Sequence, residues 1–198
     1  MWRQAAGRLR AAALVLVSGA FLTASGAVLA QGTPPSGYGA TLRWYHEQAQ
    51  AGNPAAQFLL GIKYETGTDV PKDLARAAQL FEQAAKQGYA DAQFKLASLL
   101  ETGRGVETDK DAVEAWYRAA AFDGHAPAQY NLALMLLSSA RGEDALVEGL
   151  SWLMRAGRGG IARADGLLAK WRDVVSGEIM ARAEELSKLP LGSGASPR

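Results

Sequence analysis

Cysteine is absent from this 198-residue chain. Without cysteine the protein can form no disulfide, holds no thiol nucleophile and builds no cysteine-based metal site. An N-terminus lipidated on cysteine is excluded for the same reason. Histidine occurs only twice, as His46 and His125, and these two residues lack the spacing of zinc ligands. We therefore expect the protein to bind no metal and no cofactor.

A charge excess of either sign is also missing. The full chain has 21 Lys and Arg against 20 Asp and Glu, a net charge of +1. We expect a segment that carries Arg3, Arg8 and Arg10 to be removed, and no acidic residue precedes Glu47. Removal would leave 18 basic against 20 acidic residues, or −2. A nucleic-acid binder needs a basic stripe that displaces phosphate counterions, so we expect no nucleic-acid partner.

The N-terminal residues have the pattern of an export signal. A basic stretch with three arginines precedes the apolar segment from Ala11 to Leu29, and a small-residue cleavage site follows at Ala30. The pattern predicts a signal peptide over residues 1–30 and a periplasmic mature protein. The alternative is an uncleaved anchor, because about 20 mostly apolar residues can just span a bilayer. An uncleaved signal would be the only membrane contact that we expect.

Beyond this segment the sequence repeats with a period of 36 residues. An alanine recurs at Ala56, Ala92, Ala128 and Ala164, and a leucine recurs four residues after each of them. Glycines recur in a third register, at Gly52, Gly88, Gly124 and Gly160. Registers that agree over this length identify a repeat array, which must be recognised before any other structural prediction is made.

Each repeat contains two helical patterns, and strand patterns are missing throughout. In the first helix apolar residues recur at i, i+4 and i+8, as in Ala92, Leu96 and Leu100. In the second helix they form a broader stripe that suits a core-facing helix. Glycines and aspartates between the helices predict that the second helices restart near Asp73 and Asp111. We therefore predict an all-α fold, a right-handed α/α superhelical solenoid of about four helix-turn-helix repeats of 36 residues.

The pattern divides the chain into segments. We expect a flexible linker over 31–40, a repeat domain over 41–188 and a disordered tail over 189–198. The repeat domain comprises a capping helix over 41–52, repeats over 53–88, 89–124 and 125–160, and a degenerate C-terminal repeat over 161–188. In that last repeat Asp165 replaces the repeated glutamine and Arg172 replaces a large apolar residue, and Ser176 can cap a final helix. The glycines Gly149 and Gly157 predict that the second helix of the third repeat is the softest.

The repeats resemble a known family. The segments Ala56-Gln57-Phe58, Ala92-Gln93-Phe94 and Ala128-Gln129-Tyr130 are similar to the start of the Sel-like (Sel-one-like) repeat, a cousin of the tetratricopeptide repeat. The similarity continues through Gly103-Arg104-Gly105-Val106 and through Trp116-Tyr117-Arg118 to Gly124. It implies an α/α superhelix and the usual role of this family, which is to assemble other proteins as an adaptor.

The resemblance also indicates where a partner would bind. Phe58, Phe94 and Tyr130 share a register on the first helices that tends to line the concave groove in tetratricopeptides. We predict a partner-binding row on the concave surface, formed by these aromatic residues and their neighbours: Phe58, Ile62, Phe94, Ser98, Tyr130 and Leu134. The alternative is that the three rings only seal adjacent repeats.

Two other sets of residues suggest chemistry less strongly. Trp44, Trp116 and Trp152 share a register and could stack on cell-wall sugars, but aromatic residues at helical spacing usually pack in the core. Four carboxylates recur with the repeats, and such pairs could hydrolyse glycosides or act as helix caps and surface charges: Glu65, Glu101, Asp73 and Asp109. No nucleophile with an attendant base is recognisable, so we predict that the protein is not an enzyme.

These observations favour an exported periplasmic scaffold, adaptor or regulator that binds a protein partner, such as an envelope or sensor component. The alternatives are a cell-wall-active enzyme, which could be β-lactamase-like or peptidoglycan-directed, and a cofactor of a lytic enzyme. Turnover of a chromogenic β-lactam or of peptidoglycan would distinguish the enzyme from the scaffold.

Overall fold

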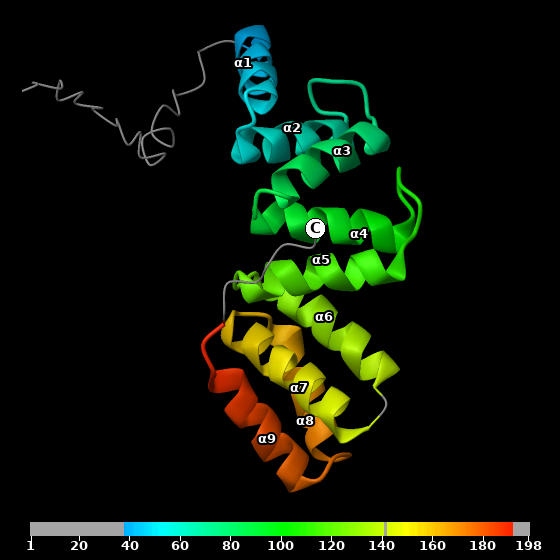
Figure 1. The fold of residues 1–198 in the computed structure, drawn as a ribbon, viewed down its shortest axis with the longest axis vertical. Helices are drawn as coiled ribbons and strands as arrows, with labels where there is room; N and C mark the ends of the chain where they lie inside the picture. Colours follow the sequence, from blue (N-terminus) through cyan, green and yellow to red (C-terminus); the bar gives the residue numbers. More distant parts are fainter. Residues whose placement is uncertain (1–37, 141, 192–198) are drawn as a thin grey trace, which may run out of the picture. The chain divides into compact units, whose positions relative to one another are not determined.

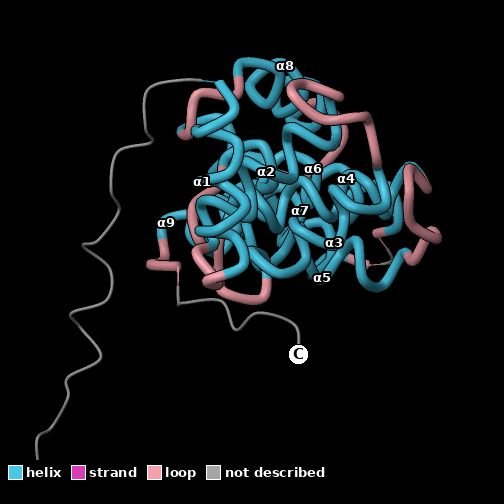
Figure 2. The backbone as a smooth tube through the Cα atoms, turned by 90° about the horizontal axis from the view of Figure 1, so that it is seen from above, coloured by secondary structure: helices cyan, strands magenta, loops and turns pink. Residues whose placement is uncertain are grey.

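The computed structural model describes residues 38–140 and 142–191. Within these ranges the chain forms nine α-helices and no strand, which confirms the predicted all-α helical repeat solenoid (Figures 1 and 2). No helix in this part of the chain is both long and apolar enough to span a membrane. The helices, in chain order, are α1 (Tyr38–Gln50), α2 (Pro54–Thr66), α3 (Leu74–Ala85), α4 (Ala90–Thr102), α5 (Lys110–Phe122), α6 (Ala126–Ser139), α7 (Glu143–Arg158), α8 (Ala162–Arg172) and α9 (Gly177–Lys188).

Six of these helices form three successive hairpins. Helix α2 packs on α3, α4 on α5 and α6 on α7, and each hairpin joins the next through α3 with α4 and α5 with α6. Figure 1 shows the three pairs following one another in the order of the chain. Each repeat thus supplies a first helix (α2, α4 or α6) and a second helix (α3, α5 or α7). The residues that the period places in one register therefore occupy equivalent places in successive hairpins.

Aspartates cap the second helices of the first two hairpins. Asp73 Oδ1 accepts a hydrogen bond from the backbone N–H of Arg76 at 2.9 Å, and Asp109 Oδ1 accepts one from that of Ala112 at 3.1 Å. A side-chain oxygen at this position satisfies an amide that has no partner within the helix. The prediction of a restart near Asp73 is confirmed. The restart expected near Asp111 occurs two residues earlier, because Asp109 takes the capping position and leaves Asp111 in the first turn.

The loop before α5 is fixed by a close backbone approach. Gly105 has a φ of 77°, and a Cβ built on it would lie 2.5 Å from the carbonyl carbon of Leu74. Only glycine allows both the left-handed conformation and this contact with the start of α3. The loop is therefore held against the preceding repeat, and it delivers Asp109 and Asp111 to a fixed position.

A buried glutamine links each first helix to the helix before it. The side-chain amides of Gln57, Gln93 and Gln129 donate to the carbonyl oxygens of Ala49, Ala85 and Ala121, at 3.2, 3.3 and 3.0 Å. Each bond adds a side-chain donor to a carbonyl in the last turn of the preceding helix, which also accepts the backbone N–H of the glycine three residues later: Gly52, Gly88 or Gly124. The repeated glutamine is therefore a structural residue of the repeat.

One core cluster runs from α3 to α9 and a smaller one joins α1, α2 and α3, and glycines allow two close contacts between paired helices. A Cβ on Gly61 of α2 would lie 2.6 Å from Cε1 of Phe81, whose ring is fully buried. A Cβ on Gly149 of α7 would lie 2.8 Å from Cγ of Leu137 in α6. Helix α7, which we expected to be the softest, runs unbroken for 16 residues. Gly149 thus contributes a close approach between α6 and α7, and the softness of α7 stays a prediction.

The array begins earlier than the sequence indicated. We expected a linker to Ala40 and a helix from Thr41, but α1 begins at Tyr38. Gly39 suggested a linker, but glycine weakens a helix only by about 1 kcal/mol through its low propensity, so one glycine does not prevent the helix from starting. Helix α1 packs on α2 and opens the array as the expected capping helix. The rest of the predicted linker and the predicted signal peptide lie outside the described residues.

The degenerate last repeat forms two helices, but α9 packs chiefly along α7 instead of closing a hairpin on α8. Arg155 of α7 donates to the carbonyl oxygens of Leu186 at 2.8 Å and Leu189 at 2.7 Å, at the C-terminal end of α9. A cation is favourable at this end of a helix dipole. Ser176 caps α9 as predicted, by accepting from Ile179 at 3.3 Å. Of the predicted tail, residues 192–198 lie beyond the part that the structure describes.

Candidate partner-binding surface

The six predicted binding residues lie at two equivalent positions on the three first helices. On each first helix the first of the two positions holds an aromatic residue, and the second position, four residues later, holds a smaller side chain. Two positions four residues apart share one face of a helix. Leu134 is 39% exposed and the other five residues are half-buried. We call these six residues the first-helix row: Phe58 and Ile62 of α2, Phe94 and Ser98 of α4, and Tyr130 and Leu134 of α6.

The rings of the first-helix row pack within and between the repeats. The Phe58 ring lies 5.7 Å from that of Phe81 in its own hairpin and 5.2 Å from that of Tyr89, which precedes the next first helix. Phe94 repeats this arrangement one unit later, with Tyr117 at 5.8 Å and His125 at 4.7 Å. These contacts match the interpretation that the rings seal adjacent repeats. That they also bind a partner stays a prediction.

Tyr130 differs because Ile161 stands in the register of Tyr89 and His125, and the ring meets a cation of α8 instead of a second ring. The guanidinium carbon of Arg163 in α8 lies 5.3 Å from the centroid of the Tyr130 ring. A guanidinium over an aromatic face is attracted by the ring quadrupole. Together with the 39% exposed Leu134, this makes the α6 end of the row more polar and more accessible than its α2 end.

His125 is a structural residue that sequence reasoning did not identify. Its Nδ1 accepts from the backbone N–H of Ala128 at 3.1 Å and so caps α6, while its Nε2 lies 3.2 Å from Oδ1 of Asp91. An acceptor at Nδ1 places the proton of the neutral ring on Nε2, where it can be donated to Asp91. Burial lowers the pKa of His125 and outweighs the opposite effect of the Asp91 carboxylate. Two signals point to this role: its position before a helical pattern, and its register, in which Asn53 caps α2 through the N–H of Ala56.

The recurring carboxylates have structural partners. Asp73 and Asp109 cap helices, as one of the two interpretations predicted. Glu65 at the end of α2 pairs with Lys95 of α4 at 2.8 Å across the first repeat junction. Glu101, the equivalent residue of α4, accepts a hydrogen bond at 2.8 Å from the hydroxyl of the buried Tyr117. Burial, reinforced by that bond to Glu101, raises the pKa of Tyr117 well above its usual value.

The tryptophans of the second register contribute mainly to packing. Trp116 and Trp152 are 8% and 4% exposed, and the Trp152 ring meets that of Phe122 edge-on at 5.2 Å. Trp44 of α1 is half-buried and lies 5.2 Å from Tyr45. Two of the three rings are thus too buried to stack on a sugar. Among the described residues no group of three or more His, Cys, Asp or Glu side chains is arranged to hold a metal ion.

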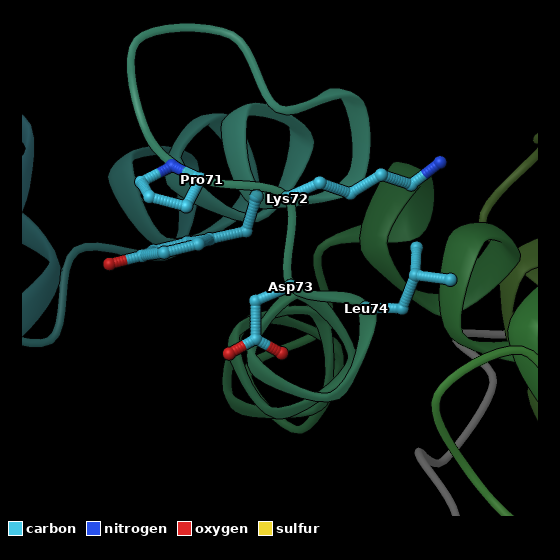
Figure 3. Close-up of a pocket in the computed structure, with 5 residues that line it drawn as sticks. Pro71, Lys72, Asp73 and Leu74 are labelled. Carbon is cyan, nitrogen blue, oxygen red and sulfur yellow. The ribbon is translucent and has the colours of Figure 1, made fainter.

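Two surface pockets lie at equivalent places in successive repeats. The first, of about 650 Å³, is lined by Tyr64 of α2 and by residues 71–74 at the start of α3. Figure 3 shows the side chains of Lys72 and Asp73 pointing away from each other at its rim. The second, of about 510 Å³, is bounded by the end of α4, the start of α5 and the end of α6. We call it the α4–α6 pocket; sequence reasoning did not identify it.

The α4–α6 pocket combines an apolar floor with an acidic rim. Each of its three helices supplies one apolar residue to the lining. The charged residues of the lining are four carboxylates and one lysine. Such a pocket suits a ligand that has both an apolar body and a positive charge. The apolar residues are Leu100, Val113 and Met135, and the charged ones are Glu101, Asp109, Asp111, Glu114 and Lys110.

Comparisons with known proteins agree with this architecture. A crystal structure of a Sel1 repeat protein from Oxalobacter formigenes is similar, with a TM-score of 0.60 and 28% identity over 66% of this chain and 98% of that one. A protective antigen present in uropathogenic Escherichia coli strains, which displays an SLR fold, has a TM-score of 0.61 and 30% identity over 73% of this chain. The chain covers 32% of that antigen.

The family comparison assigns the hairpins directly. No curated protein matches the chain. The sequence model of the Sel1 repeat matches three times, at residues 54–89, 90–125 and 126–160, and these ranges correspond to the hairpins α2–α3, α4–α5 and α6–α7. Repeats of this kind indicate a scaffold for protein interactions and are generally not catalytic. The chain belongs to the Sel1 repeat family.

Proposed function

We propose that this protein is an exported, non-enzymatic scaffold of the bacterial periplasm that binds a protein partner along its first helices. The observation that carries the proposal is the succession of three Sel1 hairpins, which repeats the two positions of the first-helix row on α2, α4 and α6. Stacked repeats offer an extended surface for a helix or an extended peptide. The apolar residues of the row, including the exposed Leu134, would supply the contact area.

Export is the second part of the proposal and is supported by the sequence of residues 1–30. A basic start, an apolar stretch and small residues near Ala30 are typical of a cleaved signal. Fractionation of cells and N-terminal sequencing of the recovered protein test it. We expect a periplasmic protein that begins near Gln31; a cytoplasmic protein with an intact N-terminus would contradict this part alone.

Site-specific photo-crosslinking in cells tests partner binding. A photoreactive amino acid at Ile62, Ser98 or Leu134 should give a cross-link to the same protein from each position. The matched controls are the exposed Gln83 of α3 and Glu184 of α9, which are not on the first helices. A common adduct from the three first-helix positions, and none from the controls, supports the proposal. Equal capture from all positions, or none from the row, would contradict it.

A further inference from the structure

The junction between the first and second hairpins and the junction between the second and third hairpins are built from equivalent residues but differ in charge. At the first junction the Glu65 side chain is 14% exposed and pairs with Lys95 at 2.8 Å, and Lys72 lines the adjacent pocket. The residues one period later are Glu101, Asn131 and Thr108. The second junction thus keeps the acid of the first and replaces both lysines by neutral residues.

The second junction also gains acids. Ala75 and Ala78 of α3 correspond to Asp111 and Glu114 of α5, and both acids line the α4–α6 pocket. Asp109 is used as a helix cap, and Glu114 pairs with Arg118 at 2.8 Å. The other two acids of the pocket, Glu101 and Asp111, form no ion pair with a cation among the described residues.

Of these two acids, Glu101 would be stabilised more by a nearby cation. It lies in the last turn of α4, where the negative end of the helix dipole disfavours a carboxylate. The equivalent Glu65 has its lysine, whereas Glu101 has only the hydroxyl of Tyr117 and remains exposed. The apolar floor formed by Leu100, Val113 and Met135 lies in the same pocket. A lysine or arginine side chain matches both features, because its stem is apolar and its end is charged.

We propose that the α4–α6 pocket binds a lysine or arginine side chain of the polypeptide partner, whose cation takes the place that Lys95 fills at the first junction. The proposal rests on the proposed function, since the basic residue belongs to the protein partner. It names a chemical requirement for that partner: a basic residue flanked by apolar ones. The first junction provides an internal comparison, because its equivalent acid, Glu65, is already paired with Lys95.

The test uses two peptides and the mature protein. The probes are acetyl-Ala-Leu-Lys-Leu-Ala-amide and the same peptide with norleucine in place of lysine, which keeps the stem and removes the charge. Titration followed by amide chemical shifts should map the lysine peptide to Glu101, Val113 and Met135. We expect the lysine peptide to bind at least about threefold more tightly than the norleucine peptide, as one partly exposed ion pair allows. The difference should shrink at high salt.

Three variants assign the effect to the pocket. Glu101→Gln keeps an acceptor for Tyr117 and should abolish the preference for lysine over norleucine. Asn131→Lys restores the cation of the first junction and should weaken binding of the lysine peptide by a similar factor. Glu65→Gln, the matched control, should leave it unchanged. Thermal unfolding of each variant confirms that the fold is kept.

Several outcomes would overturn the proposal. They are equal binding of the two peptides, chemical shift changes confined to other helices, and equal effects of Glu65→Gln and Glu101→Gln. The peptide titration is independent of the cross-links that test the proposed function. Cross-links from the first-helix row without any preference for lysine would leave the scaffold in place and remove only this pocket.

Discussion

Replacement of Gly61 by alanine tests the packing of the first hairpin. In a helix, Gly→Ala ordinarily stabilises by up to about 1 kcal/mol, because alanine has the higher helix propensity and the less flexible unfolded chain. At Gly61 the new Cβ would lie 2.6 and 2.9 Å from two carbons of the fully buried Phe81 ring. Overpacking of this kind costs about 1–3 kcal/mol. We therefore expect a net loss of about 1 kcal/mol in the free energy of unfolding.

Gly166 provides the matched control for this substitution. It is exposed and lies inside α8, and a Cβ built on it meets nothing within 4 Å. Gly166→Ala should therefore gain about 0.5–1 kcal/mol, so the two variants should differ by about 2 kcal/mol. Urea unfolding followed by circular dichroism measures both. Gly61→Ala introduced into a Phe81→Leu background should become neutral or stabilising, since the clash with the ring is gone. Equal stabilisation by Gly61→Ala and Gly166→Ala would refute the packing described here.

Three further predictions concern the glutamine link, the histidine cap and catalysis. Gln129→Leu should lower the free energy of unfolding by about 1 kcal/mol in the same assay, because the carbonyl of Ala121 loses the Gln129 amide and keeps only backbone donors such as the N–H of Gly124; an unchanged midpoint would contradict the link. Burial lowers the pKa of His125 in the folded protein below the value of about 6.5 that it has in the unfolded chain. The stability that its cap contributes is therefore fully present above about pH 6.5 and is lost as the pH falls through the pKa of the folded state. Unfolding free energy measured against pH should decline in this window, and His125→Asn, which still caps but does not titrate there, should flatten that decline. The mature protein should not hydrolyse a chromogenic β-lactam; turnover that survives repeated purification would favour an enzyme.

The repeat itself was predictable because residues at equivalent positions have the same structural role in every hairpin. Ala92 and Leu96 fill the core of their hairpin, as Ala128 and Leu132 do one period later, so the sequence shows the same apolar spacing each time. Gln93 is part of the pattern that carries the family resemblance. Its hydrogen bond to the preceding helix emerged only from the structure, since spacing gives no information on what a side chain contacts.

The features that were missed are those in which one repeat departs from the others. Glu101 of the α4–α6 pocket has no cation within the described part of the chain because Asn131 stands where Lys95 stands one period earlier, and a search for recurring residues passes over such differences. The docking of α9 on α7 depends on bonds from Arg155 to backbone carbonyls 31 and 34 residues away, which no local pattern records. The register of His125 holds four different residues, Asn53, Tyr89, His125 and Ile161, so the cap was missed although Asn53 caps α2 in the same way.

The most direct test of the scaffold is the affinity of the cross-linked partner for a protein with an altered first-helix row. Ile62→Ser and Leu134→Ser together remove two apolar side chains, each worth about 1.5 kcal/mol if fully buried by the partner. Calorimetric titration of the purified partner should then show affinity reduced at least about tenfold, and Gln83→Ser should have no effect. Undiminished affinity of the double variant would contradict binding along the first helices.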